Sequence, residues 1–356
     1  MASFTGTADN YLDLMTALRD AITTTSPTIS WTAVRDTSTS PVGANSPNTT
    51  EMIFRGDAAN GGSPSRFLYW GIQSYEDPGA GIYGFAVRGF TGFQDGSPVG
   101  SVAFEDQPDA SKAAYVPLQN TTMTYWIFAN ERRVIMVVKT GTSYQWMHAG
   151  FLDTFATETE YPYPLMIAGS SHVNTVTFSS NSIDYSAFID PGGDNSENPI
   201  VGLSTMYMRF TDGSWYPIKN FYKSGSTAAN RTDRNVWPLS GYNNADWPTD
   251  GVVNASKEWR QIMYTTSIGG TPTATLAQTP GSPDDISPMY PLTIIWSSPS
   301  LQLVGEISGA FWVSNVGGLT SEDDIFDSGV SPKQGYKVFK NVHRTDAWEF
   351  GAIKDE

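Results

Sequence analysis

The chain contains no cysteine, and this absence excludes several kinds of chemistry at once. Disulfide bonds, thiolate metal sites and cysteine nucleophiles are all ruled out across its 356 residues. The fold must therefore be held together by packing and hydrogen bonds alone. A protein of this kind is indifferent to the redox state of its surroundings, so it could assemble in a reducing cytoplasm and persist outside a cell.

Basic residues are scarce relative to acidic ones. The chain has 21 Lys and Arg against 36 Asp and Glu, which gives a formal net charge of −15. A surface of that sign repels phosphate backbones, so we expect no nucleic acid partner. Charged residues make up only 16 % of the chain, and Ser, Thr, Asn and Gly must supply much of the remaining polar surface.

Long apolar runs are missing as well. No window reaches the roughly 18 apolar residues that a membrane helix needs, so no membrane insertion is expected. The first residues lack a basic stretch followed by an apolar run, and we expect no secretory signal there. Aromatic residues are abundant instead, at 13 % of the chain. Their large rings can fill a core without many helices, and their frequency argues against disorder.

The residue pattern predicts a mainly β protein with one amphipathic helix near the N-terminus. The helix is predicted from apolar residues at three- and four-residue steps, with Thr7 or Asp9 as its cap. It could dock on the core of its own chain or form an arm that packs on a neighbouring subunit. For the second case the interface candidates are Tyr11, Leu12, Met15 and Leu18.

Short aromatic and β-branched runs separated by turn residues predict antiparallel strands in sandwich- or barrel-like modules. The clearest pair covers residues 123–130 and 133–140, and residues 144–150 extend it to a three-stranded meander. Residues 134–138 are apolar at every position, so both faces of that strand should be covered. Residues 66–75 and 82–90 bracket a second hairpin turn.

Changes in composition divide the chain into three segments. Residues 1–170 are predicted to hold the helix and a β domain, residues 171–288 a loop-rich β or insertion region, and residues 289–356 a C-terminal β module. The middle segment has long loops at 190–198 and 269–288. Loops of that length in a compact domain usually carry function or make contacts.

Residues 79–84 read GAGIYG, which matches the G-x-G-x-x-G pattern of dinucleotide-binding loops. Asp77 and Pro78 precede the glycines and a β-type run follows, so we interpret the segment as a hairpin turn. The histidines, at His148, His172 and His343, lie too far apart for the short spacings typical of a zinc site. We predict that each is a partly buried, hydrogen-bonded side chain.

Two acidic clusters could be calcium loops or solvated loops. The first holds Asp190, Asp194 and Glu197, and the second holds Glu322, Asp323, Asp324 and Asp327. Neither has the EF-hand spacing, and we favour solvated loops for both. We therefore predict no metal, no cofactor and no catalytic residue. A Ser–His–acid triad or a pair of glycosidase carboxylates depends on proximity in space and stays open at this point.

Aromatic residues in the middle of the chain form a second set of contact candidates. These are Trp215, Tyr216, Trp237, Tyr242 and Trp247. Rings in loops could anchor a protein interface, stack on the sugars of a host-surface glycan, or fill small satellite cores beneath the loops. All three interpretations remain open from sequence.

Three sequence blocks together resemble a family of virion structural proteins from tailed bacteriophages. They are residues 10–15 followed by Trp31, residues 125–135 followed by 161–170, and the closing strands at 303–354. The blocks lie in the same order as in that family and are spread over most of the chain. Residues 171–288 match only loosely, around Trp237 and Pro238. Members are usually described only as virion structural proteins, so the resemblance implies location and class and carries over no catalytic residue.

The resemblance implies a non-enzymatic structural subunit that is assembled in the host cytoplasm and located in the virion. Its partners would be other virion proteins and copies of itself. We expect a neck, tail or baseplate position because the chain lacks the long helix and extended arm of a major shell protein. The alternatives are a virion-attached receptor- or glycan-binding module and, third, a glycan hydrolase.

Overall fold

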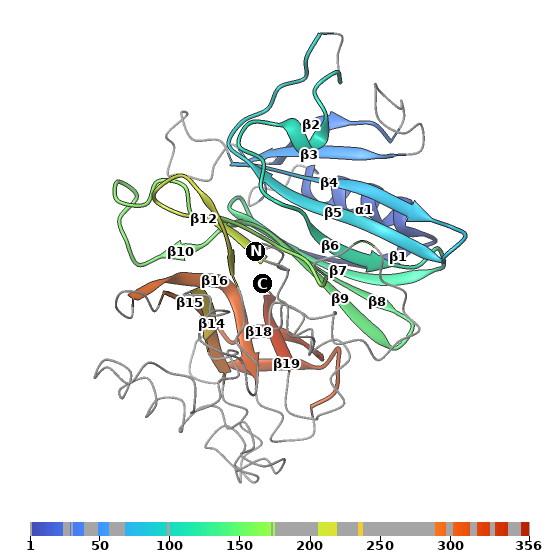
Figure 1. Ribbon diagram of the computed structural model, residues 1–356. Helices are drawn as coiled ribbons and strands as arrows, with labels where there is room; N and C mark the ends of the chain where they lie inside the picture. The colour runs from blue at the N-terminus through green and yellow to red at the C-terminus, as the bar shows by residue number, and fades with distance from the viewer. Residues whose placement is uncertain are drawn as a thin grey trace, which may run out of the picture.

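The computed structural model describes residues 2–23, 29, 31–38, 49–56, 68–97, 100–171, 174, 206–218, 234–237, 289–296, 302–313, 319–327, 332–340 and 350–355. These residues form a mainly β structure with antiparallel sheets, as the sequence predicts. Three sheets stack as layers, and one α-helix of the described part lies between two of them (Figure 1). We name them the central, helix-side and C-terminal sheets.

The central sheet contains seven antiparallel strands. In spatial order they are β1 (Ala2–Ala8), β7 (Met123–Ala129), β8 (Arg133–Thr140), β9 (Ser143–Phe151), β11 (Leu165–Ala168), β12 (Met206–Arg209) and β13 (Trp215–Ile218). The β7–β8–β9 meander confirms the clearest sequence prediction. Strand β1 was not predicted.

The helix-side sheet is a five-stranded meander above the central sheet in Figure 1. Its strands are β2 (Trp31–Asp36), β3 (Glu51–Gly56), β4 (Leu68–Asp77), β5 (Ile82–Phe90) and β6 (Ala114–Leu118). The β4–β5 turn contains the GAGIYG segment, where the Ala80 amide donates to the Asp77 carbonyl at 3.1 Å and Gly81 has a φ of +68°. This confirms the hairpin interpretation. The loop after β5 carries the 3₁₀ turn η1 (Phe104–Asp106).

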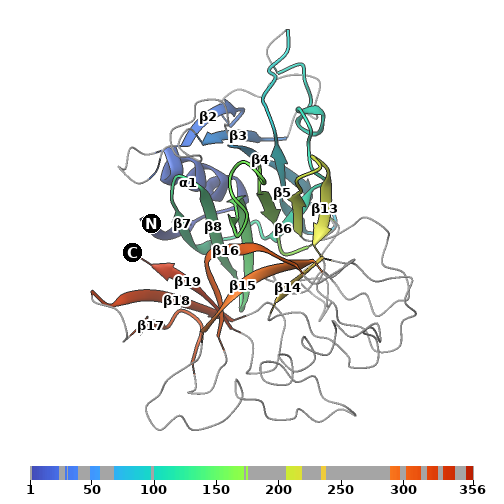
Figure 2. The same ribbon diagram turned by 90° about the vertical axis from the view of Figure 1, so that its left-hand side faces the viewer.

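The C-terminal sheet lies on the other side of the central sheet (Figure 2). Its order is β14 (Arg234–Trp237), β15 (Met289–Trp296), β16 (Gln302–Val313), β19 (Phe350–Asp355), β18 (Gln334–Lys340) and β17 (Asp324–Asp327). The connection between β9 and β11 contains a two-residue strand, β10 (Asp153–Thr154), which pairs with β16.

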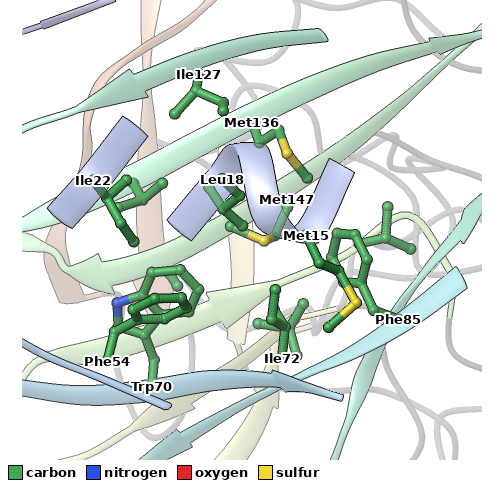
Figure 3. Packing of buried hydrophobic residues seen from close by; sticks show 14 of the residues in the cluster. Met15, Leu18, Ile22, Phe54, Trp70, Ile72, Phe85, Ile127, Met136 and Met147 are labelled. Carbon is green, nitrogen blue, oxygen red and sulfur yellow. The ribbon is translucent and has the colours of Figure 1, made fainter. Parts of the chain in front are cut away.

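The helix α1 (Tyr11–Thr23) fills the space between the central and helix-side sheets. Asn10 caps it, because its Oδ1 accepts hydrogen bonds from the Leu12 and Asp13 amides at 2.9 Å each. The predicted cap at Thr7 or Asp9 is therefore wrong, and Thr7 belongs to β1. Figure 3 shows the apolar stripe of α1 between the two sheets. Met15, Leu18 and Ile22 lie among Ile127, Met136 and Met147 of the central sheet and Phe54, Trp70, Ile72 and Phe85 of the helix-side sheet.

The central sheet is covered on both faces. Every residue of β8 from Arg133 to Val138 is buried, which confirms the prediction from its continuous apolar run. Val134, Met136 and Val138 belong to the core that contains α1, whereas Ile135 and Val137 belong to the core shared with the C-terminal sheet. Successive residues of one strand therefore serve two different cores.

The sheets cross the segment boundaries that composition indicated. Strands β12 and β13, from the middle segment, complete the central sheet, although its other strands come from residues 1–170. Strand β10 pairs with β16 across both proposed boundaries. Hydrogen bonding between strands depends on position in space, and composition along the chain does not record it.

Candidate functional site

Three of the four helix candidates are core residues. Tyr11 is 3 % exposed and Met15 and Leu18 are fully buried, because the two sheets of the same chain cover the apolar stripe of α1. The Tyr11 hydroxyl donates to Glu76 Oε2 at 2.6 Å, and burial together with this carboxylate raises the Tyr11 pKa. A side chain without exposed surface cannot contact a neighbour. The arm interpretation requires side chains that can reach a neighbouring subunit, and among the four candidates only Leu12, which is 36 % exposed, meets this requirement.

The two mid-chain aromatics that the structure describes lie in β13, at one edge of the central sheet. Trp215 donates its indole N–H to the Asp109 carbonyl at 2.7 Å, and its ring leaves no room for a side chain at Gly89. The Tyr216 hydroxyl donates to Asp212 Oδ2 at 2.5 Å. Both rings pack against the two main cores of their own chain, so they have a packing role, although on a strand and not in small cores beneath loops. The side chain of Trp237, and all of Tyr242 and Trp247, lie outside the described residues.

The second acidic cluster is engaged by donors of its own chain. Glu322 Oε1 accepts from Lys139 Nζ at 2.6 Å, Asp324 pairs with Lys337 at 2.6 Å, and Asp323 accepts from the Thr320 amide and hydroxyl. No group of three or more His, Asp or Glu residues is placed to hold a metal within the described ranges. Asp190, Asp194 and Glu197 lie outside those ranges.

The contact between the central and C-terminal sheets, which we call the seam, is built from aromatic rings. Phe339 of β18 is fully buried and contacts rings from β7 and β9. The centroid distances are 5.1 Å to Trp126, 6.3 Å to Phe128, 6.0 Å to Tyr144 and 5.7 Å to Trp146. Such clustered rings make the seam a rigid, well-packed junction.

Two titratable residues are buried at the seam side of the central sheet. His148 is fully buried, and burial together with the positive charge of Arg133 lowers its pKa to about 3. Burial also lowers the pKa of Arg133 to about 10, against the attraction of Asp153. His148 is therefore neutral at physiological pH and closed to solvent, which suits a structural role. The sequence predicts partly buried histidines, and His148 is buried more completely than that; His172 and His343 lie outside the described residues.

The rim of the seam carries a polar bridge between the two sheets. Lys139 and Tyr144 of the central sheet both donate to Glu322 Oε1, at 2.6 and 2.7 Å. Lys337 of β18 donates to the Glu322 carbonyl at 3.2 Å. Burial alone would raise the pKa of Glu322, but the hydrogen bonds from Lys139 and Tyr144 lower it. Sequence reasoning could not find this bridge, because Lys139 and Glu322 are far apart along the chain.

The feature that sequence reasoning missed and that suits a contact surface is the free edge of β1. Among the described residues β1 pairs only with β7, in an unbroken register from Ala2↔Ala129 to Ala8↔Met123. Ser3, Thr5 and Thr7 are exposed. The alternation of polar and apolar residues in ASFTGTA is the strand signal that could have revealed it.

No protein-family model matches the chain, and a search of curated proteins returns no match. In the part of the chain that the structure describes, no helix has the length and apolar character needed to span a membrane.

Proposed function

We propose that this protein is a non-enzymatic structural subunit of a tailed-phage virion, in the neck, tail or baseplate, that acts by assembling with other virion proteins and copies of itself. The observation that carries the proposal is where the family-like blocks lie. The second block, residues 125–135 with 161–170, and the third, residues 303–354, are distant in sequence, yet side chains of both meet at the seam, whereas the first block packs in the core around α1.

The convergence is specific in its contacts. Trp126 and Phe128 of the second block enclose Phe339 of the closing block. Met166 and Ala168 belong to the same core. A resemblance confined to scattered residues would carry little weight. Direct packing between two blocks so far apart along the chain supports a shared scaffold, and through it the class of protein that the blocks resemble.

The layered architecture fits the physical demands of a particle. A virion subunit must stay assembled after dilution, which requires rigid surfaces that lose little entropy on association. A central sheet covered on both faces, with aromatic packing at the seam, provides such rigidity. Unpaired strand edges then offer backbone hydrogen bonds to neighbours.

Immunoelectron microscopy tests the proposal. Intact particles of the phage that encodes this chain would be labelled with a gold-conjugated antibody raised against the purified protein. We expect label at the neck, tail or baseplate, and label on the shell would correct the position within the particle. Finding no label on any intact particle, while the same antibody detects the purified protein, would overturn the proposal.

The glycan-binding alternative has less support. Sugar stacking requires an aromatic face that is free to meet a ligand, whereas Trp215 is fastened to Asp109 and packs over Gly89. A polysaccharide-binding assay separates the two functions. Specific binding that Trp215→Ala abolishes, with the thermal stability unchanged, would favour the alternative.

A further inference from the structure

The edge strands of the three sheets differ in how they are protected against pairing. Strand β2 carries Arg35 and Asp36 and has a register shift between Ala33 and Arg35. Strand β13 is four residues long and contains Pro217. Strand β17 is equally short and has an aspartate at each end. Charges, prolines, bulges and short length are the usual devices that prevent edge-to-edge association.

Strand β1 has none of these devices. It is seven residues long, contains no charge and no proline, and pairs with β7 without a register shift. Its seam-side residues Ser3, Thr5 and Thr7 are exposed and neutral, in a chain whose net charge is −15. Two copies of such an acidic protein repel each other over most of their surface. A neutral edge is where that repulsion is weakest.

The sequence of β1 is also complementary to itself. In an antiparallel pair centred on Thr5, Phe4 lies opposite Gly6 of the second copy, Ser3 lies opposite Thr7, and Ala2 lies opposite Ala8. The Tyr125 ring of the same subunit already lies over Gly6, so the complementarity rests on the other pairs. The hydroxyl residues meet as Thr–Thr and Ser–Thr pairs, which are favourable cross-strand neighbours. Centring on Phe4 or Gly6 instead would leave the ends of both strands unpaired.

We propose that β1 is a homotypic assembly edge: two copies of this chain pair their β1 strands antiparallel about a two-fold axis at Thr5. The two central sheets then form one continuous sheet, and the contact is closed because each copy offers the same edge. The inference rests on the proposed function in that copies of the chain meet in the particle. Its occupant is a second copy, and the test distinguishes that copy from any other strand.

Engineered disulfides test the register, since the wild-type chain has no cysteine. Opposite Cα atoms in an antiparallel pair lie about 4.5 to 5.5 Å apart, within the range of a disulfide. Thr5→Cys should therefore give a covalent dimer under mild oxidation. Thr7→Cys alone should not, because its copy lies about 13 Å away along the strand. Mixing Ser3→Cys with Thr7→Cys protein should restore cross-linking. Thr211→Cys, exposed in the turn between β12 and β13, is the matched control.

Charge substitutions provide an independent test that needs no oxidation. Thr5→Asp and Thr5→Lys each place like charges opposite one another at the axis and should weaken dimerisation about tenfold. An equal mixture of the two variants should recover dimers, now mixed. The readout is mass by analytical ultracentrifugation across a concentration series. Thr211→Asp and Thr211→Lys should leave the dimer unchanged.

The outcomes are decisive for the edge. A wild-type chain that stays monomeric at the highest soluble concentration, with Thr5→Cys cross-linking no better than Thr211→Cys both in solution and in assembled particles, overturns the inference. Cross-linking of Thr5→Cys to a different virion protein overturns it too. If antibody still labels the particles, the structural function stands without the homotypic edge. If covalent dimers form but no particle is labelled, the edge stands and the virion function fails.

Discussion

The two faces of the central sheet are covered in different ways. Towards the helix-side sheet, α1 fills the space, and its Met15 lies in one core with Met136 and Met147 of the central sheet. Towards the C-terminal sheet no described helix intervenes, and the rings around Phe339 join sheet to sheet directly. Both cores contain methionines and aromatic rings, but Phe339 has four rings as neighbours, which require specific geometry, whereas the methionines beside α1 adapt to irregular gaps. A deletion beside the methionines of α1 should therefore be tolerated better than a deletion at Phe339.

The two faces also differ in how far apart along the chain their contacting residues lie. The helix-side core is assembled mostly from residues before 170, many of them in consecutive hairpins. The seam joins β7, β8 and β9 to strands beyond residue 289, as the hydrogen bonds from Lys139 and Tyr144 to Glu322 illustrate. Non-local contacts of this kind form late, because closing a long loop costs entropy before the contact stabilises it.

The largest expected effect is at the centre of the seam. Phe339→Ala should lower the free energy of unfolding by about 4 kcal/mol, because a fully buried ring leaves a cavity among four other rings. Urea denaturation followed by tryptophan fluorescence measures it. Phe326→Ala is the matched control, since Phe326 is 63 % exposed and its loss should cost less than about 1 kcal/mol. Equal effects for the two variants would show that Phe339 is not central to the seam.

On the helix side a comparable deletion should cost less. Leu18→Ala removes a fully buried side chain from α1 and should destabilise the protein by about 3 kcal/mol, since the neighbouring methionines can partly refill the space. Leu12→Ala on the same helix, where the side chain is 36 % exposed, should have a much smaller effect. The same denaturation assay applies. A larger loss for Leu18→Ala than for Phe339→Ala would reverse the ranking of the two faces.

A third effect is a loss of stability at low pH, which arises at the seam side because His148 is buried there. His148 has a folded-state pKa of about 3 against an ordinary value of 6.5, so below pH 6.5 the unfolded chain takes up a proton that the folded chain does not. Stability should therefore fall as the pH decreases from 6.5 towards 3, by about 2 kcal/mol at pH 5 relative to pH 8. His148→Gln should remove this part of the pH dependence. An unchanged pH profile in the variant would mean that His148 titrates normally in the folded protein.

The smallest effect is expected at the rim. Glu322→Gln should cost less than about 1 kcal/mol, because the Lys139–Glu322 pair is about one-third exposed. The folded-state pKa of Glu322 is lowered, so its contribution is present above its ordinary pKa of 4.5 and disappears as the pH falls below it. High salt should reduce the difference from wild type. Asp324→Asn is the control, because it breaks an ion pair with Lys337 that lies within the C-terminal sheet and does not connect two sheets.

The sequence predicted the parts of this fold that depend on continuous apolar runs. The β7–β8–β9 meander and the two-sided burial of β8 follow from residues 134–138, where every position is apolar. Strand β1 was not predicted although ASFTGTA alternates polar and apolar residues, because Ser, Thr and Gly are also common in loops and pairing with β7 decides between the two. The two-residue strand β10 is too short to leave any periodic signal.

The candidate contact residues show a deeper limit. An amphipathic stripe such as Tyr11, Met15 and Leu18 is identical in sequence whether its own sheets or a neighbouring subunit covers it, and here its own sheets do. Trp215 looked like a loop aromatic because its partner, the Asp109 carbonyl, lies more than one hundred residues away. Pairings of this kind are decided in three dimensions.

Strand β10 gives the molecule a mechanical property. Between β9 and β11 the backbone leaves the central sheet, hydrogen-bonds to Gly305 and Glu306 of β16, and returns. The same backbone segment thus takes part in two sheets in turn. A force that pulls the two sheets apart would have to break the hydrogen bonds between β10 and β16 as well as the side-chain packing. The two sheets should therefore resist mechanical separation as one unit.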